Sequence, residues 1–288
     1  MKLDELILNQ TTRASLERIL VNPPHSLLVA GETGTGKETL AQALCCQLLN
    51  MNSLDQSPYS LQVWPDGSTF TIEQVREITR FLKLKTTGRT GIRRALILHN
   101  CEKMNHVSQN GLLKTLEEPP ADTIIVLSVT QTKALKATIR SRAQLINVLP
   151  LPLESATDYF KTKGHALNDI NRAYLLSNGA IGLMSALLED KQHPFYKQID
   201  EAKKICQMSA FDKLTIVDGL SKDRDKVIWL LDALQRIAKA GLHHAVANSA
   251  NEAANRWRRQ LSAVHKAQGY MTHNPNLKLL LSDLFLQM

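Results

Sequence analysis

The sequence lacks the features that define several large protein classes. Its longest apolar runs, such as residues 124–129, are far shorter than the roughly 18 residues that a membrane-spanning helix needs. The first residues, MKLDELILNQTT, leave no room for the apolar segment of a signal peptide. No repeat and no low-complexity tract is found. We therefore expect a cytoplasmic protein that has no membrane partner.

Cysteine is scarce, with 4 residues in 288. Cys45 and Cys46 are adjacent, and Cys101 and Cys206 are isolated, so no CxxC pair exists to bring two thiolates onto one zinc ion. A chain of this length does not need a disulfide framework, and reduced thiols fit a cytoplasmic protein. The adjacent His243 and His244 have no acidic or thiolate partner at ligand spacing. We expect no zinc and no other metal ligated by protein side chains alone.

The charge and the length are informative. Lys and Arg number 35 against 27 Asp and Glu, giving a net charge of +8, and this excess makes nucleic acid the first partner to consider. An apolar fraction of 43% is ordinary for a globular chain with a sizeable core. A length of 288 residues suits two or three domains.

Residues 1–150 alternate short β-branched runs with helical patterns. The apolar runs predict buried strands at 26–30, 95–98 and 123–129. Apolar residues at helical spacing predict helices at 38–49, at 70–84, and around Leu112, Leu113 and Leu116. This alternation predicts an α/β domain with a parallel sheet covered on both faces.

The stretch Leu149-Pro150-Leu151-Pro152-Leu153 cannot continue a helix or an interior strand, so a domain boundary is predicted there. Almost everything beyond it reads as helical. Residues 226–246 place Val227, Ile228, Leu231, Leu234, Ile237 and Ala238 on one stripe, and 276–288 form a last short apolar helix. The predicted domains are 1–150, 151–192 and 193–288, an α/β domain followed by two helical pieces.

A phosphate-binding loop follows the first predicted strand. Gly31, Gly34 and Gly36 precede Lys37, and the next helix opens directly after them. Such a loop directs backbone N–H groups and a helix N-terminus at phosphate, while the lysine reaches the outer phosphates. Candidate nucleotide-binding residues are Gly31, Thr33, Gly34, Thr35, Gly36, Lys37, Glu38 and Thr39. The strict pattern has Ser or Thr after the lysine to hold Mg²⁺, and Glu38 stands there, so magnesium handling stays open.

The second half of a nucleotide-hydrolysing site is expected after the strand at 95–98. An Asp-Glu pair would anchor Mg²⁺ and orient the attacking water. This chain has His99 and Asn100 instead. Imidazole is a poor ligand for a hard cation, and an amide accepts no proton. Glu102 lies further along and is expected to point elsewhere. The sequence predicts that nucleotide binding is kept and hydrolysis is lost.

Several motifs resemble those of the bacterial clamp-loader AAA+ subunits. Residues 25–31 (HSLLVAG) lead into the phosphate loop as in that family, and residues 110–120 (NGLLKTLEEPP) are very similar to its most recognisable stretch. Residues 139–143 (IRSRA) match its Ser-Arg-Cys motif, with Ala143 in place of cysteine. Residues 274–277 with 284–286 resemble its last collar helix. The resemblance covers nearly the whole chain and implies an AAA+ core, a helical lid and a collar.

Within the family, the departures resemble the delta prime type of DNA polymerase III subunit more than the hydrolysing gamma/tau type. The Asp-Glu pair is His99-Asn100, the nucleotide-sensing arginine of the lid falls at Gly182, and the insertion with zinc-binding cysteines is missing. The resemblance implies a holoenzyme component without independent ATPase activity that binds ATP or ADP. Its implied partners are gamma/tau and delta subunits, primer–template DNA and, transiently, the sliding clamp.

The resemblance also assigns roles to arginines and lysines. Arg142 would be a finger that reaches the phosphate of a neighbouring subunit in trans, with Arg140 as its nearby competitor. From Arg76 to Arg94 there are seven basic residues and one acid, Glu77, and from Lys133 to Arg142 four more with no acid. Candidate DNA-phosphate contacts are Arg76, Arg80, Lys83, Arg93 and Arg94. Any one of them could instead lie on a solvated helix face.

Two alternatives stay open. One is an ATP-hydrolysing gamma-like subunit. The other is an enhancer-binding transcription activator, whose phosphate loop resembles GETGTGKE at residues 31–38 and in which Glu after Lys is compatible with activity. Against the activator class, the chain has no GAFTGA loop, no Asp-Glu after the second strand and no helix-turn-helix at its C-terminus.

Overall fold

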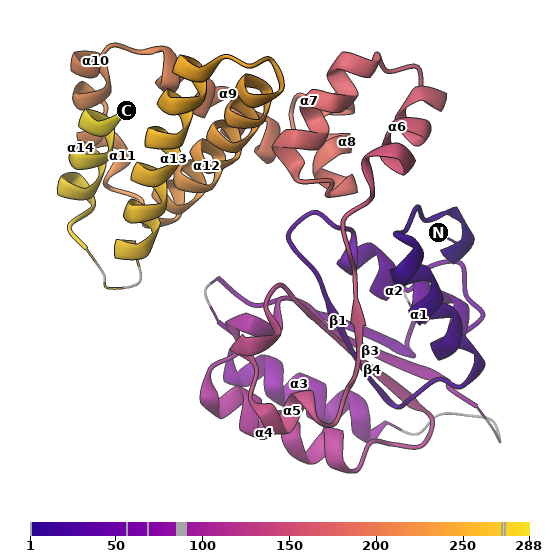
Figure 1. Cartoon of the computed structure of the whole chain (residues 1–288). Helices are drawn as coiled ribbons and strands as arrows, with labels where there is room; N and C mark the ends of the chain where they lie inside the picture. The colour runs from indigo at the N-terminus through magenta and orange to yellow at the C-terminus, as the bar shows by residue number, and fades with distance from the viewer. Residues whose placement is uncertain (1, 56, 68, 85–90, 272, 274) are drawn as a thin grey trace. The chain divides into compact units, whose positions relative to one another are not determined.

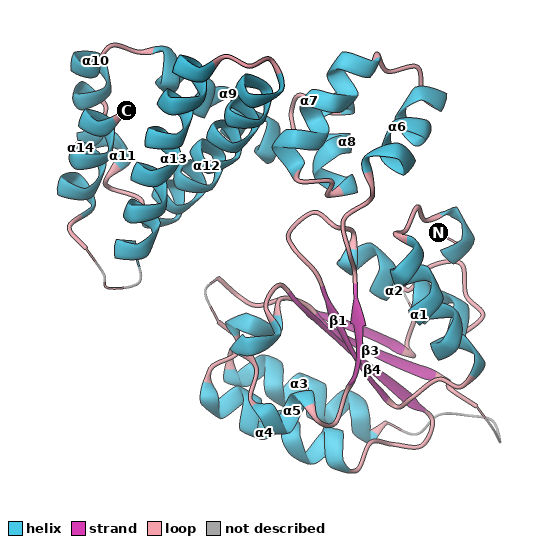
Figure 2. Cartoon of the chain, viewed as in Figure 1, coloured by secondary structure: helices cyan, strands magenta, loops and turns pink. Residues whose placement is uncertain are grey.

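The computed structural model describes residues 2–55, 57–67, 69–84, 91–271, 273 and 275–288. The chain divides into two compact units, residues 1–152 and 153–288, and each is considered by itself. The first contains the sheet, and the second is built from helices (Figure 2). The finer division of the helical part into 151–192 and 193–288 stays a prediction.

Five parallel strands form the sheet of the first unit, in the spatial order β2-β3-β4-β1-β5. The central strands are wholly buried because their residues are almost all apolar. Leu127 lies opposite both Leu28 and Leu98, so the ends of β1 and β3 reach the same edge of the sheet on either side of β4. The strands are β1 (Ser26–Ala30), β2 (Ser60–Val63), β3 (Arg94–Leu98), β4 (Thr123–Val129) and β5 (Gln144–Asn147).

Helices cover both faces of this sheet (Figure 1). Alternate residues of a strand point to opposite faces, so Leu27 and Val29 join one core cluster while Leu28 and Ala30 join another. The first cluster includes residues of α1 and α2, and the second includes residues of α3, α4 and α5. Their bounds are α1 (Gln10–Val21), α2 (Lys37–Leu48), α3 (Ile72–Lys83), α4 (His106–Glu117) and α5 (Ala137–Arg140).

The predicted central strands are confirmed, whereas β2 and β5 were not predicted. Both are four-residue strands at the two edges of the sheet, and their polar residues do not give a clear apolar run. Helix starts follow local capping. Thr71 accepts from the backbone N–H of Gln74, whose side chain accepts from Thr71, and α3 therefore begins at Ile72 rather than at residue 70.

The second unit consists of nine helices within the described residues. Residues from α7 and α8 share one core cluster with residues from α9 and α11 to α14. The predicted stripe of α12 is wrong at Ile228, which is 43% exposed, while Leu230 is buried instead. The helices are α6 (Leu153–Thr162), α7 (Leu167–Ser177), α8 (Ile181–Glu189), α9 (Pro194–Gln207), α10 (Ala210–Thr215), α11 (Val217–Leu220), α12 (Arg224–Ala247), α13 (Asn251–Met271) and α14 (Leu277–Gln287).

Candidate nucleotide site and clamp-loader motifs

The glycines of the phosphate loop are required by its backbone. Gly34 and Gly36 have φ angles of 80° and 86°, in the left-handed region that favours glycine. Gly31 has no room for a side chain, because an added Cβ would lie 2.7 Å from both Thr35 Oγ1 and the carbonyl oxygen of Val148. Gly36 is the N-cap of α2, so the loop passes directly into a helix N-terminus.

A set of short hydrogen bonds fixes the loop on the sheet. The N–H of Gly31 donates to the carbonyl of Val129 at the end of β4, over 3.1 Å. Thr35 is buried, and both its N–H and its hydroxyl donate to the carbonyl of Glu32, at 3.2 and 2.8 Å. Thr33 is exposed and Thr39 is half-buried. The predicted nucleotide-binding residues therefore form one continuous turn at the start of α2.

Lys37 is buried within this turn and paired with its neighbour. Its side chain is only 2% exposed, and its Nζ lies 2.9 Å from Glu38 Oε1. A buried ammonium group needs an anionic or hydrogen-bonding partner, and Glu38 supplies one in the chain itself. The residue after the lysine is thus a carboxylate engaged with the lysine rather than a free hydroxyl.

His99, just after β3, is completely buried and stacks on Trp64, with ring centroids 3.7 Å apart and an interplanar angle of 6°. Its Nε2 lies 3.2 Å from Gln62 Oε1, which also accepts from Gln42 Nε2 at 2.9 Å. Burial lowers the pKa of His99 to about 4, while the charge of Glu38 raises it and that of Lys37 lowers it. His99 is therefore a neutral group beside the lysine–glutamate pair.

The tautomer of His99 follows from its partner. Because Gln62 Oε1 accepts hydrogen bonds, Nε2 of His99 carries the hydrogen and donates it. Its Nδ1 is then an acceptor, and it is buried without a partner among the described residues. Gln42, Gln62 and Trp64 were not singled out from the sequence, because they come from α2, β2 and the loop after β2 and carry no motif.

The neighbouring polar groups are engaged with β4. Asn100 has a left-handed φ of 52°, and its N–H donates to Ser128 Oγ at 3.2 Å. Glu102 Oε2 accepts from the N–H of Thr130 at 3.3 Å. Within the described parts of the chain, no group of three or more His, Cys, Asp or Glu residues could hold a metal ion.

Arg142 lies just beyond α5, on the surface of the first unit. Its Nη2 is 2.7 Å from Glu117 Oε1, and its Nη1 donates to the carbonyl of Thr138 at 3.0 Å. The side chain remains 35% exposed. Arg140 is exposed as well, and it forms no ion pair with any described residue. Both predicted arginines are therefore accessible, but only Arg142 is held by a carboxylate.

The predicted DNA-phosphate residues divide into two groups. Arg76, Arg80 and Lys83 are exposed and follow one another at helical spacing along one face of α3. Arg93 is partly buried, with Nη2 3.8 Å from Asp122. Two further basic residues of this segment, Lys85 and Arg89, lie outside the described residues.

The prediction for Arg94 is wrong. Its side chain is 3% exposed, and its Nη2 lies 3.1 Å from Asp122 Oδ1. Nε donates to Thr123 Oγ1, and Nη1 donates to the carbonyls of Phe81 and Leu84 at the end of α3. Arg94 is a structural residue with its hydrogen-bonding capacity used inside the fold, so it cannot also serve DNA phosphate.

Comparisons with known proteins agree with these motifs. A family model described as DNA polymerase III, delta subunit matches residues 11–152. The DNA polymerase III subunit delta' of Escherichia coli K12 is 27% identical over 258 residues, covering 79% of this chain and 73% of that protein. The delta' subunit of Bacillus subtilis is 26% identical, covering 92% and 90% respectively. The sequence of this chain is therefore similar to the delta' subunits of DNA polymerase III.

A solved structure supports the fold of this chain. A DNA polymerase III gamma subunit-related protein of Thermotoga maritima matches with a TM-score of 0.57 and 19% identity, covering 96% of this chain and 98% of that one. The parallel five-stranded sheet with its helices, followed by a helical C-terminal part, is thus the predicted AAA+ architecture.

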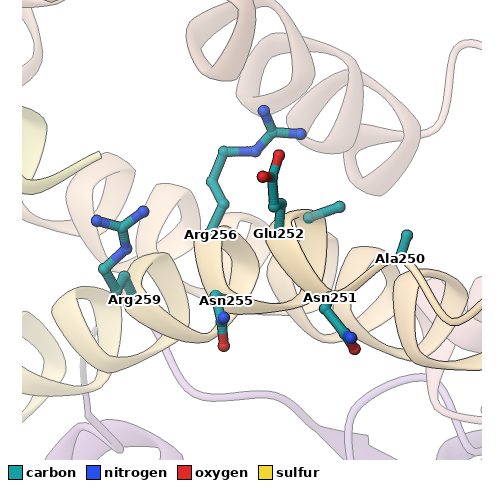
Figure 3. A pocket seen from close by; sticks show the side chains of 7 residues that line it. Ala250, Asn251, Glu252, Asn255, Arg256 and Arg259 are labelled. Carbon is teal, nitrogen blue, oxygen red and sulfur yellow. The ribbon is translucent and has the colours of Figure 1, made fainter.

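A large surface hollow of this chain is lined by residues far in the sequence from the phosphate loop. It has a volume of about 770 Å³ and is lined at the start of α13 by residues including Asn251, Glu252, Asn255, Arg256 and Arg259 (Figure 3). Figure 3 shows Glu252 beside Arg256, so the lining carries charges of both signs. None of its lining residues belongs to the phosphate loop, and size alone does not mark it as the functional site.

Two of the cysteines are buried thiols with raised pKa values. Cys45 and Cys101 are completely buried, and burial raises the pKa of both thiols. A thiol with a raised pKa carries little thiolate and reacts slowly.

No helix in the described residues is both long and apolar enough to span a bilayer.

Proposed function

We propose that this chain is a nucleotide-binding, non-hydrolysing subunit of a clamp loader that places the sliding clamp on primed DNA during replication in the cytoplasm. In this role it assembles with gamma/tau and delta subunits and supplies Arg142 in trans to the ATP site of a neighbour. The delta prime-like relationship supports the assembly, and the geometry of the site supports the division between binding and hydrolysis.

The phosphate loop supports nucleotide binding. Its glycines keep side chains out of the turn, and the first N–H groups of α2 have no acceptor within the helix. Bound phosphate would replace Glu38 as the partner of Lys37. When bound, ATP or ADP supplies phosphate oxygens for these donors.

The observation that carries the absence of hydrolysis is His99. A neutral, buried imidazole stacked on Trp64 takes the place where a hydrolysing subunit needs an acid. Glu102 holds the N–H of Thr130 and Glu38 holds Lys37. Neither carboxylate stands directly after β3, where His99 and Asn100 take the place of the Asp-Glu pair, so the residues support binding without turnover.

Two surfaces support the role in the assembled ring. The half-exposed Arg142 can reach a charge outside its own chain, as a trans finger must. The exposed face of α3 with Arg76, Arg80 and Lys83 can contact DNA phosphates without reading sequence. A matched pair tests the second surface: Arg80→Ala lowers the stimulation of the loader by DNA, whereas exposed Arg18→Ala on α1 does not.

Turnover by the purified chain tests the proposal directly. We expect measurable binding of labelled ATP or ADP and no phosphate release above the background of a Lys37→Ala control. Sustained ATP hydrolysis that disappears in the Lys37→Ala variant would place the chain among the hydrolysing gamma-like subunits. A pull-down with the gamma/tau and delta subunits of the same organism tests assembly separately, since a lone ATPase would not be retained.

A further inference from the structure

The last residue of α4, Glu117, stands where a negative charge does not help the helix. The carbonyl end of a helix carries partial negative charge, and a carboxylate there is disfavoured. Pro119 and Pro120 follow after the C-cap residue Glu118 and prevent the helix from continuing, so Glu117 stays at this end. A cation close to Glu117 would offset the unfavourable position.

Arg142 provides that cation, and two contacts fix its guanidinium group. Its Nη2 lies 2.7 Å from Glu117 Oε1, and its Nη1 donates to the carbonyl of Thr138 at 3.0 Å. The two acceptors come from different helices, α4 and α5. With one contact the side chain could still rotate. Two acceptors, each bonded to a different guanidinium nitrogen, restrict both its direction and its rotation.

The supports of this pair are themselves rigid. Leu116, next to Glu117, and Ile139, next to Thr138, are buried in the same core cluster of the first unit. The N–H of Arg142 also donates to the carbonyl of Ile139 at 3.1 Å, which fixes the backbone that carries the guanidinium. The pair thus lies at the surface, with each partner attached to a packed helix.

We propose that Glu117 is the positioning residue of Arg142. It holds the arginine in a defined direction, so that the guanidinium is pre-arranged for the phosphate of a neighbouring subunit. The inference rests on the proposed role of Arg142 as a trans finger. It also explains why Arg142 rather than Arg140 is the finger, since Arg140 has no carboxylate partner among the described residues.

The experiment uses the complete loader, reconstituted with the gamma/tau and delta subunits of the same organism. DNA-stimulated ATP hydrolysis is measured for wild type, Glu117→Ala, Glu117→Gln, Arg142→Ala and the double variant Glu117→Ala/Arg142→Ala. Glu118→Ala is the matched control, because Glu118 is the adjacent exposed acid. Gel filtration reports assembly, and the ATP dependence separates kcat from KM.

A positioning role predicts a specific pattern. Glu117→Ala lowers kcat about two- to fivefold, as expected for a surface ion pair, with KM and assembly unchanged. Glu117→Gln keeps an acceptor oxygen, so its kcat lies between those of Glu117→Ala and wild type. In the Arg142→Ala background, Glu117→Ala has no further effect, because the residue it positions is gone. Glu118→Ala behaves as wild type.

Three results would overturn the inference. The first is a kcat for Glu117→Ala that equals or exceeds wild type, and the second is a further loss on adding Glu117→Ala to Arg142→Ala. The third is loss of assembly in Glu117→Ala, which would make the residue structural. Wild-type turnover in Arg142→Ala would instead remove the proposed finger and this inference with it, so the two failures are distinguishable.

Discussion

The two ends of β3 both carry a fully buried polar side chain, and the two residues have opposite fates. Arg94 at the start of the strand stays charged, with Asp122, Thr123 and the carbonyls at the end of α3 as partners. His99, just past the other end, is neutral, with one nitrogen bonded and the other unpaired among the described residues. Arg94 is buried with a full set of partners, and it is a structural residue. His99 is buried beside the Lys37–Glu38 pair with one nitrogen that has no partner among the described residues, and it belongs to the candidate nucleotide site.

The largest effect is expected from removing the charge of Arg94 at the start of β3. Arg94→Met leaves Asp122 without its shortest cationic partner and should lower the free energy of unfolding by ~3–5 kcal/mol. Urea denaturation, followed by a spectroscopic signal of the first unit, measures this change in the free energy of unfolding. Arg80→Met on the exposed face of α3 is the control and should change stability by no more than ~0.5 kcal/mol. Equal effects for the two variants would contradict the division between structural and surface arginines.

The second prediction concerns Lys37 of the phosphate loop. Lys37→Ala should weaken the binding of ATP about 10- to 100-fold, because a charge-assisted contact to phosphate is lost. Lys103→Ala removes an exposed lysine near the same edge and should leave affinity within about twofold. Titration calorimetry compares the two. An unchanged affinity in Lys37→Ala would show that the buried lysine serves only its pair with Glu38.

The third prediction uses the lowered pKa of His99. The folded protein binds the imidazole proton only near pH 4, while the unfolded chain binds it near the ordinary value of 6.5. The contribution of neutral His99 to stability is therefore complete above pH 6.5 and is lost as the pH falls toward 4. We expect this loss to be about 1–2 kcal/mol.

The His99→Gln variant isolates this contribution, because glutamine does not titrate. Its free energy of unfolding should vary less between pH 6.5 and pH 4 than that of wild type, in denaturant titrations at matched ionic strength. Parallel pH profiles for the two proteins would show that His99 titrates normally and is not shielded at the end of β3.

The smallest effect is expected from the ring that covers His99. Trp64→Leu removes the stacked indole and should cost ~0.5–1.5 kcal/mol of stability. It should also open His99 to solvent and move its pKa back toward the ordinary value, which proton NMR of the imidazole can follow. Trp229→Leu, at an exposed position in α12, is the matched control. A His99 pKa that does not move would assign the shielding to other neighbours.

Local patterns predicted the centre of the fold and the motifs of the site. Residues 26–30 and 123–129 became β1 and β4 with the predicted bounds, because runs of apolar residues have few other ways to be buried. The edge strands were missed, since four half-polar residues give no such pattern. Arg94 was assigned to the surface because its charge is visible in the sequence and its partners, from β4 and α3, are not.

Three features can be read from the amino-acid sequence alone. They are the phosphate loop, His99-Asn100 in place of Asp-Glu, and the order of motifs that resembles the clamp-loader subunits. These features are local, and their chemistry follows from residue type and spacing. Which charges are free depends on the tertiary structure. It paired Lys37 with Glu38, stacked His99 on Trp64, enclosed Arg94 and joined Glu117 to Arg142. Burial and pairing depend on groups distant in the chain, because the interior penalises a charge until a partner from another element neutralises it.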